Sequence, residues 1–240
     1  MSKFIAICGS PESGKTVTSV KLAQQIYAVT KKKIIVFSPD LTTPSLGYVF
    51  PHYKDTDLYS VGKALDHTDI FKEDVLRRIV TVKNMPDIGF LGFKAGENKY
   101  TYPRPTEDKI AELFACLRSM ADYVIVDCVS DIADLISSMA KSESDVIVRL
   151  FTADLKAMTY YASQREEYKA VRDKTVTVMN CKDKGMYLPN NDVLSCFKDA
   201  EYKLPYSFAL NKQTYTGMLI YPVKDKAYRK EVSALCKAVV

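Results

Sequence analysis

Short apolar runs alternate with longer amphipathic segments along most of this chain. The runs are almost continuously apolar and rich in β-branched residues, as in Ile34–Phe37 and Tyr123–Val126. Such continuous runs are typical of parallel strands that helices cover on both faces. We predict strands at 4–8, 34–38, 88–93, 123–128, 145–151 and 175–180, and a shorter one near 200–205. We predict helices near 15–30, 58–80, 107–120, 131–141, 154–171, 190–197 and 225–238.

The order of these elements is that of repeated βαβ units. It predicts an α/β fold of three layers, with a mostly parallel, twisted sheet of about seven strands and helices on both faces. No internal repeat, low-complexity tract or linker divides the sequence, so we predict a single domain over residues 1–240. Residues 94–106, which include Gly96, Pro103 and Pro105, are expected to form a long mobile loop.

Polar residues mark the starts of several helices. Thr106 is followed by Glu107 and Asp108, which places acidic side chains in the first turn of a helix. Asp131 and Asp154 are candidate N-caps, because an aspartate side chain can accept hydrogen bonds from the free N–H groups of a first turn.

The composition is that of a globular protein with a large core, since 47% of the 240 residues are hydrophobic. Six cysteines lie at irregular spacing without a CxxC pair, which argues against a disulfide framework, a metal site or a redox motif. Cys8, Cys116 and Cys128 are predicted to be buried, reduced thiols. We find neither a signal-peptide pattern nor an apolar stretch long enough to cross a bilayer, and we expect a soluble cytoplasmic protein.

The formal charge of +5 is concentrated in the last part of the chain. Residues 1–150 carry 19 basic and 19 acidic side chains, whereas residues 151–240 carry 15 and 10. This basic part could make weak, non-specific contact with DNA or an anionic membrane surface. Because the basic residues form no dense cluster, a solvated helical surface is the favoured interpretation. For Lys224–Val240 a terminal helix packed on the sheet is favoured over a membrane anchor.

Residues 9–16, which follow the first predicted strand, fit the pattern G-x-x-x-x-G-K-[ST]. Its glycines allow backbone N–H groups to point at an anion, and the next helix adds its positive N-terminus. Lys15 would reach the β- and γ-phosphates of a nucleoside triphosphate, and the Thr16 hydroxyl would bind Mg²⁺. The alternative is a simple strand-to-helix turn. The predicted nucleotide-binding residues here are Gly9, Ser10, Pro11, Glu12, Ser13, Gly14, Lys15, Thr16 and Val17.

Two carboxylates follow predicted strands and are candidates to complete a magnesium site. Asp127 ends the apolar run Tyr123–Val126, which places it at the carboxyl edge of the sheet, where ligands of open α/β sheets bind. Its alternative role is the N-cap of the next helix. Asp40 follows Ile34–Phe37 and could orient an attacking water or assist Mg²⁺. Its alternative role is a turn residue, which the preceding proline favours.

The order of these motifs resembles that of the MinD/ParA family of P-loop ATPases, the deviant Walker or SIMIBI group. Residues 38–46 look like the family's D-x-D-L-x-x-P-S-L switch segment, and Asp122–Asp127 looks like its Walker B strand. The resemblance implies ATP and Mg²⁺ as cofactors, with Lys15 and Asp40 catalytic and Thr16, Asp40 and Asp127 near the metal. Residues 176–180 and 204–210 are similar to the segments that frame the adenine. By that likeness Asn180 would hydrogen-bond the base, and Pro205 and Tyr206 would line its pocket.

The sequence departs from the family pattern at residues 9–16, the segment called the phosphate loop below. Ser10 stands where the family has a lysine that reaches the nucleotide of a dimer partner, and Glu12 places a negative charge near the phosphates. Ser38 replaces the first acid of the switch segment. Because the lost lysine would stabilise transition-state charge, we expect slow or partner-dependent hydrolysis. Atypical relatives such as the TadZ-like and CpaE-like proteins also depart from the full loop.

These motifs support a switch ATPase that positions or partitions a cargo through nucleotide-dependent association. Its implied partners are a second copy of the chain and an unidentified protein. A ligase or kinase of the dethiobiotin-synthetase type is an alternative, with Lys94, Lys99 and Arg104 as ligands for an acidic substrate. A non-hydrolysing nucleotide-binding scaffold is another. ATP is favoured over GTP because residues 211–214 stop short of the guanine motif N-K-x-D.

Overall fold

A computed structural model describes residues 2–184, 195–197 and 199–240 of the chain. Its strands form one eight-stranded sheet in the order β3-β4-β2-β5-β1-β6-β7-β8. All neighbouring strands run parallel except β3, which pairs antiparallel with β4. The strands are β1 (Lys3–Gly9), β2 (Ile34–Ser38), β3 (Val80–Val82), β4 (Met85–Gly92), β5 (Tyr123–Asp127), β6 (Val146–Phe151), β7 (Thr175–Asn180) and β8 (Ala200–Leu204).

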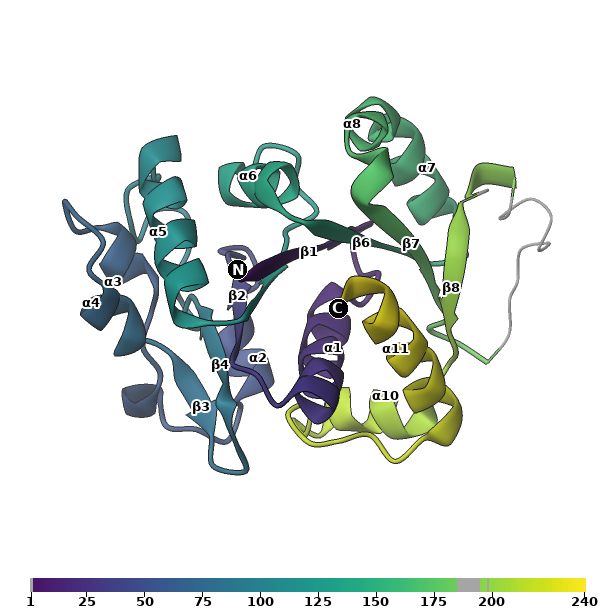
Figure 1. Cartoon of the computed structure of the whole chain (residues 1–240), viewed down its shortest axis with the longest axis horizontal. Helices are drawn as coiled ribbons and strands as arrows, with labels where there is room; N and C mark the ends of the chain where they lie inside the picture. The colour runs from purple at the N-terminus through teal and green to yellow at the C-terminus, as the bar shows by residue number, and fades with distance from the viewer. Residues whose placement is uncertain (1, 185–194, 198) are drawn as a thin grey trace.

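Helices cover both faces of this sheet, so the three-layer α/β prediction is confirmed (Figure 1). One face packs on α1 and α11, and the other on α5 and α6. In Figure 1, α7 and α8 lie on the same side of the sheet as α5 and α6. The helices are α1 (Lys15–Thr30), α2 (Ser45–Val49), α3 (Gly62–Leu65), α4 (Lys72–Leu76), α5 (Glu107–Met120), α6 (Leu135–Glu143), α7 (Leu155–Ser163), α8 (Arg165–Ala170), α10 (Phe208–Tyr215) and α11 (Lys226–Val239).

The central strands β1 and β5 explain why the apolar runs are continuous. Alternate residues of β1 face opposite layers: Ile5 and Ile7 pack on the α1 side, while Phe4 and Ala6 pack on the α5 side. Each of these four side chains is fully buried. A strand covered on both faces has no solvent-facing positions, and its sequence therefore lacks polar alternation.

The prediction for residues 58–80 was wrong. Instead of one helix, this segment contains the short helices α3 and α4 and begins β3. The polar residues Asp66 to Asp69 separate the two helices. The β-branched residues Val80–Val82 pair antiparallel with β4 at the edge of the sheet, where the strand needs only one neighbour. This eighth strand, together with α2 and α10, was not predicted.

Smaller differences concern the ends of other helices. The predicted helix 154–171 divides into α7 and α8 at Gln164, and α6 is capped by Asp134 rather than Asp131. Asp154 does cap α7, accepting a hydrogen bond from Ala157 N at 2.8 Å. Most of the predicted helix 190–197 lies outside the described residues.

The C-terminal helix α11 uses its apolar face inside the protein. Tyr228, Val232, Leu235 and Val239 are buried in the same core cluster as the apolar face of α1. Since these side chains already pack against apolar neighbours, the structure favours a packed terminal helix over a membrane anchor for this segment. Among the described residues, no helix is long and apolar enough to cross a membrane.

Candidate functional site

At two positions of the loop between β1 and α1, the backbone has a conformation that favours glycine. Gly9 has a φ of 151° and Gly14 a φ of 89°. A Cβ atom at Gly9 would lie 2.1 Å from the Leu150 carbonyl oxygen, and one at Gly14 would lie 2.4 Å from Asn180 Nδ2. The loop is therefore held tightly between β6 and the end of β7, and it opens onto the N-terminus of α1.

Lys15, the first residue of α1, folds its side chain back over this loop. Its Nζ donates to the Ser10 carbonyl oxygen at 3.2 Å and to Ser130 Oγ at 2.5 Å. Ser130 Oγ in turn donates to the Gly9 carbonyl oxygen at 2.9 Å. Burial lowers the pKa of Lys15, and the nearby Asp127 carboxylate opposes that shift. The ammonium group thus joins the loop after β1 to the loop after β5.

Asp127 ends β5 as a buried carboxylate, only 4% exposed, surrounded by hydroxyl groups. Its Oδ2 accepts hydrogen bonds from Thr16 Oγ1 at 2.7 Å and Ser38 Oγ at 3.3 Å, and its Oδ1 accepts one from Ser19 Oγ at 3.4 Å. Desolvation raises the pKa of Asp127 to about 6, although the Thr16 hydroxyl and Lys15 both lower it. Asp127 does not cap the following helix, because that cap is Asp134.

These residues fit the phosphates and the magnesium ion of a nucleotide. The Ser10 and Ser13 hydroxyls of the loop are buried without a hydrogen-bond partner in the described part of the chain. Orphaned donors beside a helix N-terminus suit phosphate oxygens. Thr16 and Asp127 offer the hard oxygen ligands that Mg²⁺ prefers. No group of three or more His, Cys, Asp or Glu side chains suited to a metal occurs among the described residues, so the phosphates and water would supply the other ligands.

Asp40 has a different environment from Asp127. Its Oδ1 accepts hydrogen bonds from the backbone N–H groups of Thr42, at 2.7 Å, and Thr43, at 2.8 Å. This is an Asx turn, the alternative role expected from the sequence. The carboxylate still lies near enough to influence the pKa of both Lys15 and Asp127.

Glu12 lies at the tip of the loop, in a left-handed conformation with a φ of 60°. Its side chain is 74% exposed and lies 3.6 Å from Lys156 Nζ and 4.0 Å from Lys182 Nζ. Two cations therefore neighbour the acid that the sequence sets close to the phosphates. The Ser10 side chain is only 2% exposed, so this position does not reach out of the molecule.

The three residues expected near a base lie at the ends of β7 and β8. Asn180 ends β7, and its Nδ2 donates to the Ser13 carbonyl oxygen at 2.8 Å. Pro205 and Tyr206 follow Leu204, the residue of β8 that pairs with Asn180, and both are partly buried. Asn180 thus contacts the phosphate loop directly, whereas Pro205 and Tyr206 lie one strand further from its centre.

Sequence reasoning missed several polar side chains of this site. Ser38 was noted only as a lost acid, yet its hydroxyl donates to Asp127. Ser19 lies three residues after Thr16, and this helical spacing places both hydroxyls on one face of α1. Ser130, the partner of Lys15, lies three residues after Asp127. A serine at that distance carries no recognisable signal of its own.

A cavity of about 220 Å³ lies beside this site, between the loops after β2, β4 and β5. Leu41, Tyr102 and Ile136 form part of its apolar wall, and Lys99 and Arg104 lie on its border. Lys94 is not among the lining residues, because its Nζ pairs with Asp55 at 2.7 Å. The loop 94–106 is further tied by Glu97, which accepts hydrogen bonds from Ser60 and Tyr102.

Comparison with known proteins identifies the fold. No protein-family model matches the sequence, and no curated protein matches it either. The septum site-determining protein MinD from Pyrococcus horikoshii, solved with Mg-ADP, is 15% identical and has a TM-score of 0.77, with 100% of this chain and 96% of that chain covered. A ParA family ATPase from Chlorobium tepidum is 13% identical with a TM-score of 0.79, over 98% and 99%.

A McdA variant from Cyanothece, solved with ATP, is 13% identical with a TM-score of 0.72, over 99% and 96% of the two chains. These similarities extend over essentially the whole chain. The protein therefore has the fold of the MinD and ParA ATPases, as its motifs predicted.

Proposed function

We propose that the protein is an ATP-dependent switch that positions a cellular cargo by changing its association with partners. The observation that carries this proposal is the contact of Thr16 with buried Asp127, directly behind the phosphate loop. That arrangement supplies a magnesium ligand and its supporting carboxylate in one place. The named neighbours are a septum site-determining protein solved with Mg-ADP, a ParA family ATPase and a McdA variant solved with ATP, which supports the same assignment.

Lys15 connects the nucleotide to the rest of the switch. When bound, Mg²⁺ and the triphosphate supply the charge to which the loops respond. Lys15 Nζ would then turn from Ser130 Oγ and the Ser10 carbonyl oxygen toward phosphate oxygens. The segment 128–134 would lose that contact, and a change in its conformation would alter the surface offered to a partner or a second copy. Thr16 would bind the magnesium ion, and Asp127 would support it through the hydrogen bond between them.

Asp40 and the base-side residues complete the proposal. Asp40 would leave its Asx turn to orient the attacking water. Hydrolysis would be slow in the absence of a partner because Ser10 stands in place of the lysine that stabilises transition-state charge. Asn180, Pro205 and Tyr206 would contact the base.

The experiment is Mg²⁺-dependent binding of a fluorescent ATP analogue, measured together with phosphate release. Lys15→Ala and Thr16→Ala should each weaken binding at least about tenfold, since each removes a charged or metal-bound contact with the phosphates. Thr18→Ala and Lys32→Ala are matched controls, since Thr18 is a buried hydroxyl of α1 and Lys32 an exposed lysine. Equal weakening in test and control variants, or no binding by the unsubstituted chain, contradicts the proposal.

A second experiment tests the switch itself. Sedimentation with ATP, ADP and no nucleotide should show association only with ATP. The Ser130→Ala variant should still bind nucleotide. Its self-association should depend on ATP differently from that of the unsubstituted chain, because the hydrogen bond between Lys15 Nζ and Ser130 Oγ is absent. Unchanged sedimentation at saturating ATP would count against the switch.

The 220 Å³ cavity favours one alternative, a ligase or kinase acting on a small acidic molecule. Its border residues Lys99 and Arg104 are cations, and it adjoins the loop that contains Asp40. ATP turnover that one metabolite stimulates, and that Arg104→Ala abolishes, would favour this alternative over the switch.

A further inference from the structure

A larger cavity lies away from the phosphate loop, beneath α7 and α8. Its volume is about 670 Å³, within the usual range for small-molecule sites. The described lining residues that matter here are Arg149 from β6, Tyr161 from α7, three cations from α8 and the turn after it, and Asp199. The three cations are Arg165, Lys169 and Arg172.

Arg149 is the fixed element of this cavity. It is only 5% exposed, and its guanidinium lies between the rings of Tyr161 and Tyr168, 4.7 and 4.8 Å from their centroids. Its Nη2 donates to Thr177 Oγ1 at 2.9 Å and to Asp199 Oδ2 at 2.7 Å. The tyrosine rings and these two acceptors hold the planar group in one orientation.

The hydrogen bonding of this pair is incomplete. Arg149 Nε and Asp199 Oδ1 are both buried without a hydrogen-bond partner in the ranges that the structure describes. A buried guanidinium N–H without an acceptor is unfavourable and suits a ligand oxygen.

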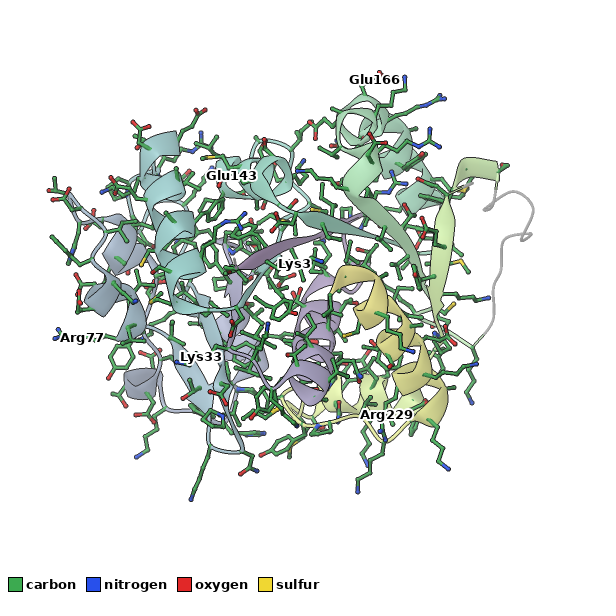
Figure 2. All side chains as sticks on the ribbon, viewed as in Figure 1. Lys3, Lys33, Arg77, Glu143, Glu166 and Arg229 are labelled. Atoms are coloured by element: carbon green, nitrogen blue, oxygen red, sulfur yellow. The ribbon has the colours of Figure 1, made fainter. Side chains whose placement is uncertain are left out.

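The charges around the cavity are unbalanced. Four cations face one carboxylate among the described lining residues, and that carboxylate already pairs with Arg149. Lys169 also pairs with Glu166, at 2.6 Å, on the exposed side of α8. Figure 2 shows Glu166 pointing outward there, away from the sheet. Arg165 and Arg172 therefore provide net positive charge at the border of the cavity.

We propose that this cavity binds a phosphorylated small molecule. Arginine guanidinium groups match the geometry of phosphate oxygens, and the Tyr161 ring offers an apolar surface for the rest of the molecule. This proposal does not depend on the function proposed above, since none of these residues belongs to the phosphate loop.

The cavity is connected to that loop through β6. Leu150 follows Arg149 and pairs with Gly9, and its carbonyl oxygen accepts a hydrogen bond from Ser10 N at 3.3 Å. Tyr160 of α7 also donates to the Ser130 carbonyl oxygen at 3.2 Å. A ligand that fixes α7 and β6 would therefore change the energetics of the phosphate loop.

The test is calorimetric titration with pyrophosphate, without Mg²⁺ and at constant ionic strength. Lys15→Ala is used to weaken the phosphate loop, so that the remaining binding reports the second site. Arg165→Ala with Arg172→Ala in that background should weaken pyrophosphate binding at least about tenfold, since each change removes a charge-assisted contact with the phosphates. Both residues are exposed, so these changes leave the core intact. The matched control is Arg229→Ala with Lys230→Ala, which removes the same charge on α11, across the sheet from α8 (Figures 1 and 2).

A second measurement uses the unsubstituted chain and needs no variant to fold. Pyrophosphate should protect Arg165 and Arg172 from phenylglyoxal, as followed by mass spectrometry, while Arg229 stays reactive. The proposal is overturned by three results: no pyrophosphate binding in the Lys15→Ala chain, equal weakening in the control, or no selective protection. Preferential binding of DNA through Arg165 and Arg172 would also overturn it, because the site would then serve a nucleic-acid backbone.

Discussion

Two neighbouring strands of this protein, β2 and β5, end at the same edge of the sheet, yet they hold their acidic residues in opposite ways. Asp127 is the last residue of β5 and is enclosed by three hydroxyl groups. Asp40 lies two residues beyond β2 and binds two backbone N–H groups of its own turn. The first carboxylate is fixed by tertiary contacts and the second by local ones. A magnesium site needs the first kind of position, and a residue that must move needs the second.

The largest effect is expected from removing the charge of the fixed carboxylate. Asp127→Asn should weaken Mg²⁺-dependent nucleotide binding roughly 100-fold, since groups that orient a metal ligand contribute about 10- to 100-fold. Titration of a fluorescent ATP analogue with Mg²⁺ and with EDTA measures this. A loss of the same size in EDTA would show that Asp127 acts on the fold and not on the metal.

The same substitution should stabilise the protein without nucleotide. The pKa of Asp127 is raised from 3.8 to about 6 in the folded state, so the folded protein binds more protons than the unfolded chain between those values. Its contribution to stability falls as pH rises through that window and stays unfavourable above pH 6. Asp127→Asn should therefore raise the unfolding free energy by up to about 3 kcal/mol at pH 8.

Urea unfolding at pH 8 and below about pH 3 tests the direction of this change in stability. The gain should vanish at the lower pH, where Asp127 is protonated in both states. A gain that persists at low pH would mean that the substitution acts through packing instead of charge.

A smaller effect on binding is expected at Asp40, the carboxylate held by its own turn. Asp40→Ala should change nucleotide affinity by less than about threefold, because its hydrogen bonds stay within its own turn, while phosphate release falls to background. The unfolding free energy should drop by about 1 kcal/mol, for two exposed side chain–backbone hydrogen bonds. Affinity and turnover measured on one preparation check this. Parallel loss of both would make Asp40 a binding residue like Asp127.

The smallest effect is expected at the tip of the loop. Glu12→Gln should raise nucleotide affinity a few-fold at low salt and leave it unchanged at high salt, because exposed charges are screened. Lys156 and Lys182 then keep their charge without the acid between them. Binding at two salt concentrations measures the change, and Glu201→Gln, on the exposed face of β8, is the control.

The sequence predicted those parts of the fold that local patterns determine. The bounds of β2, β7, α1 and α5 agree with the predicted ranges, because continuous apolar runs and amphipathic periods mark them directly. The prediction for residues 58–80 failed because part of this segment depends on a partner outside it: Val80–Val82 becomes a strand only by pairing with β4.

The candidate site divides in the same way. Lys15, Thr16 and Asp127 were found because they belong to contiguous motifs. Ser130 and Ser38 were not predicted as site residues, because each joins the site through a hydrogen bond to a residue more than 80 positions away in sequence. The environment of Asp40 needed the structure as well, because Pro39-Asp40 is compatible with both a turn and a catalytic acid.

The pairing of β1 also fixes when the phosphate loop can form. Although the loop lies within the first 16 residues, β1 has no hydrogen-bonded neighbour until β5 and β6 exist, with Lys3 opposite Tyr123 and Gly9 opposite Leu150. During synthesis on the ribosome, about half of the chain must emerge before this strand can pair with β5, and roughly two thirds before it also has β6 as a neighbour. Contacts so distant in sequence slow folding. Residues 3–16 therefore become structured only after β5 and β6 are available, and the proposed nucleotide binding could stabilise the protein only from that stage on.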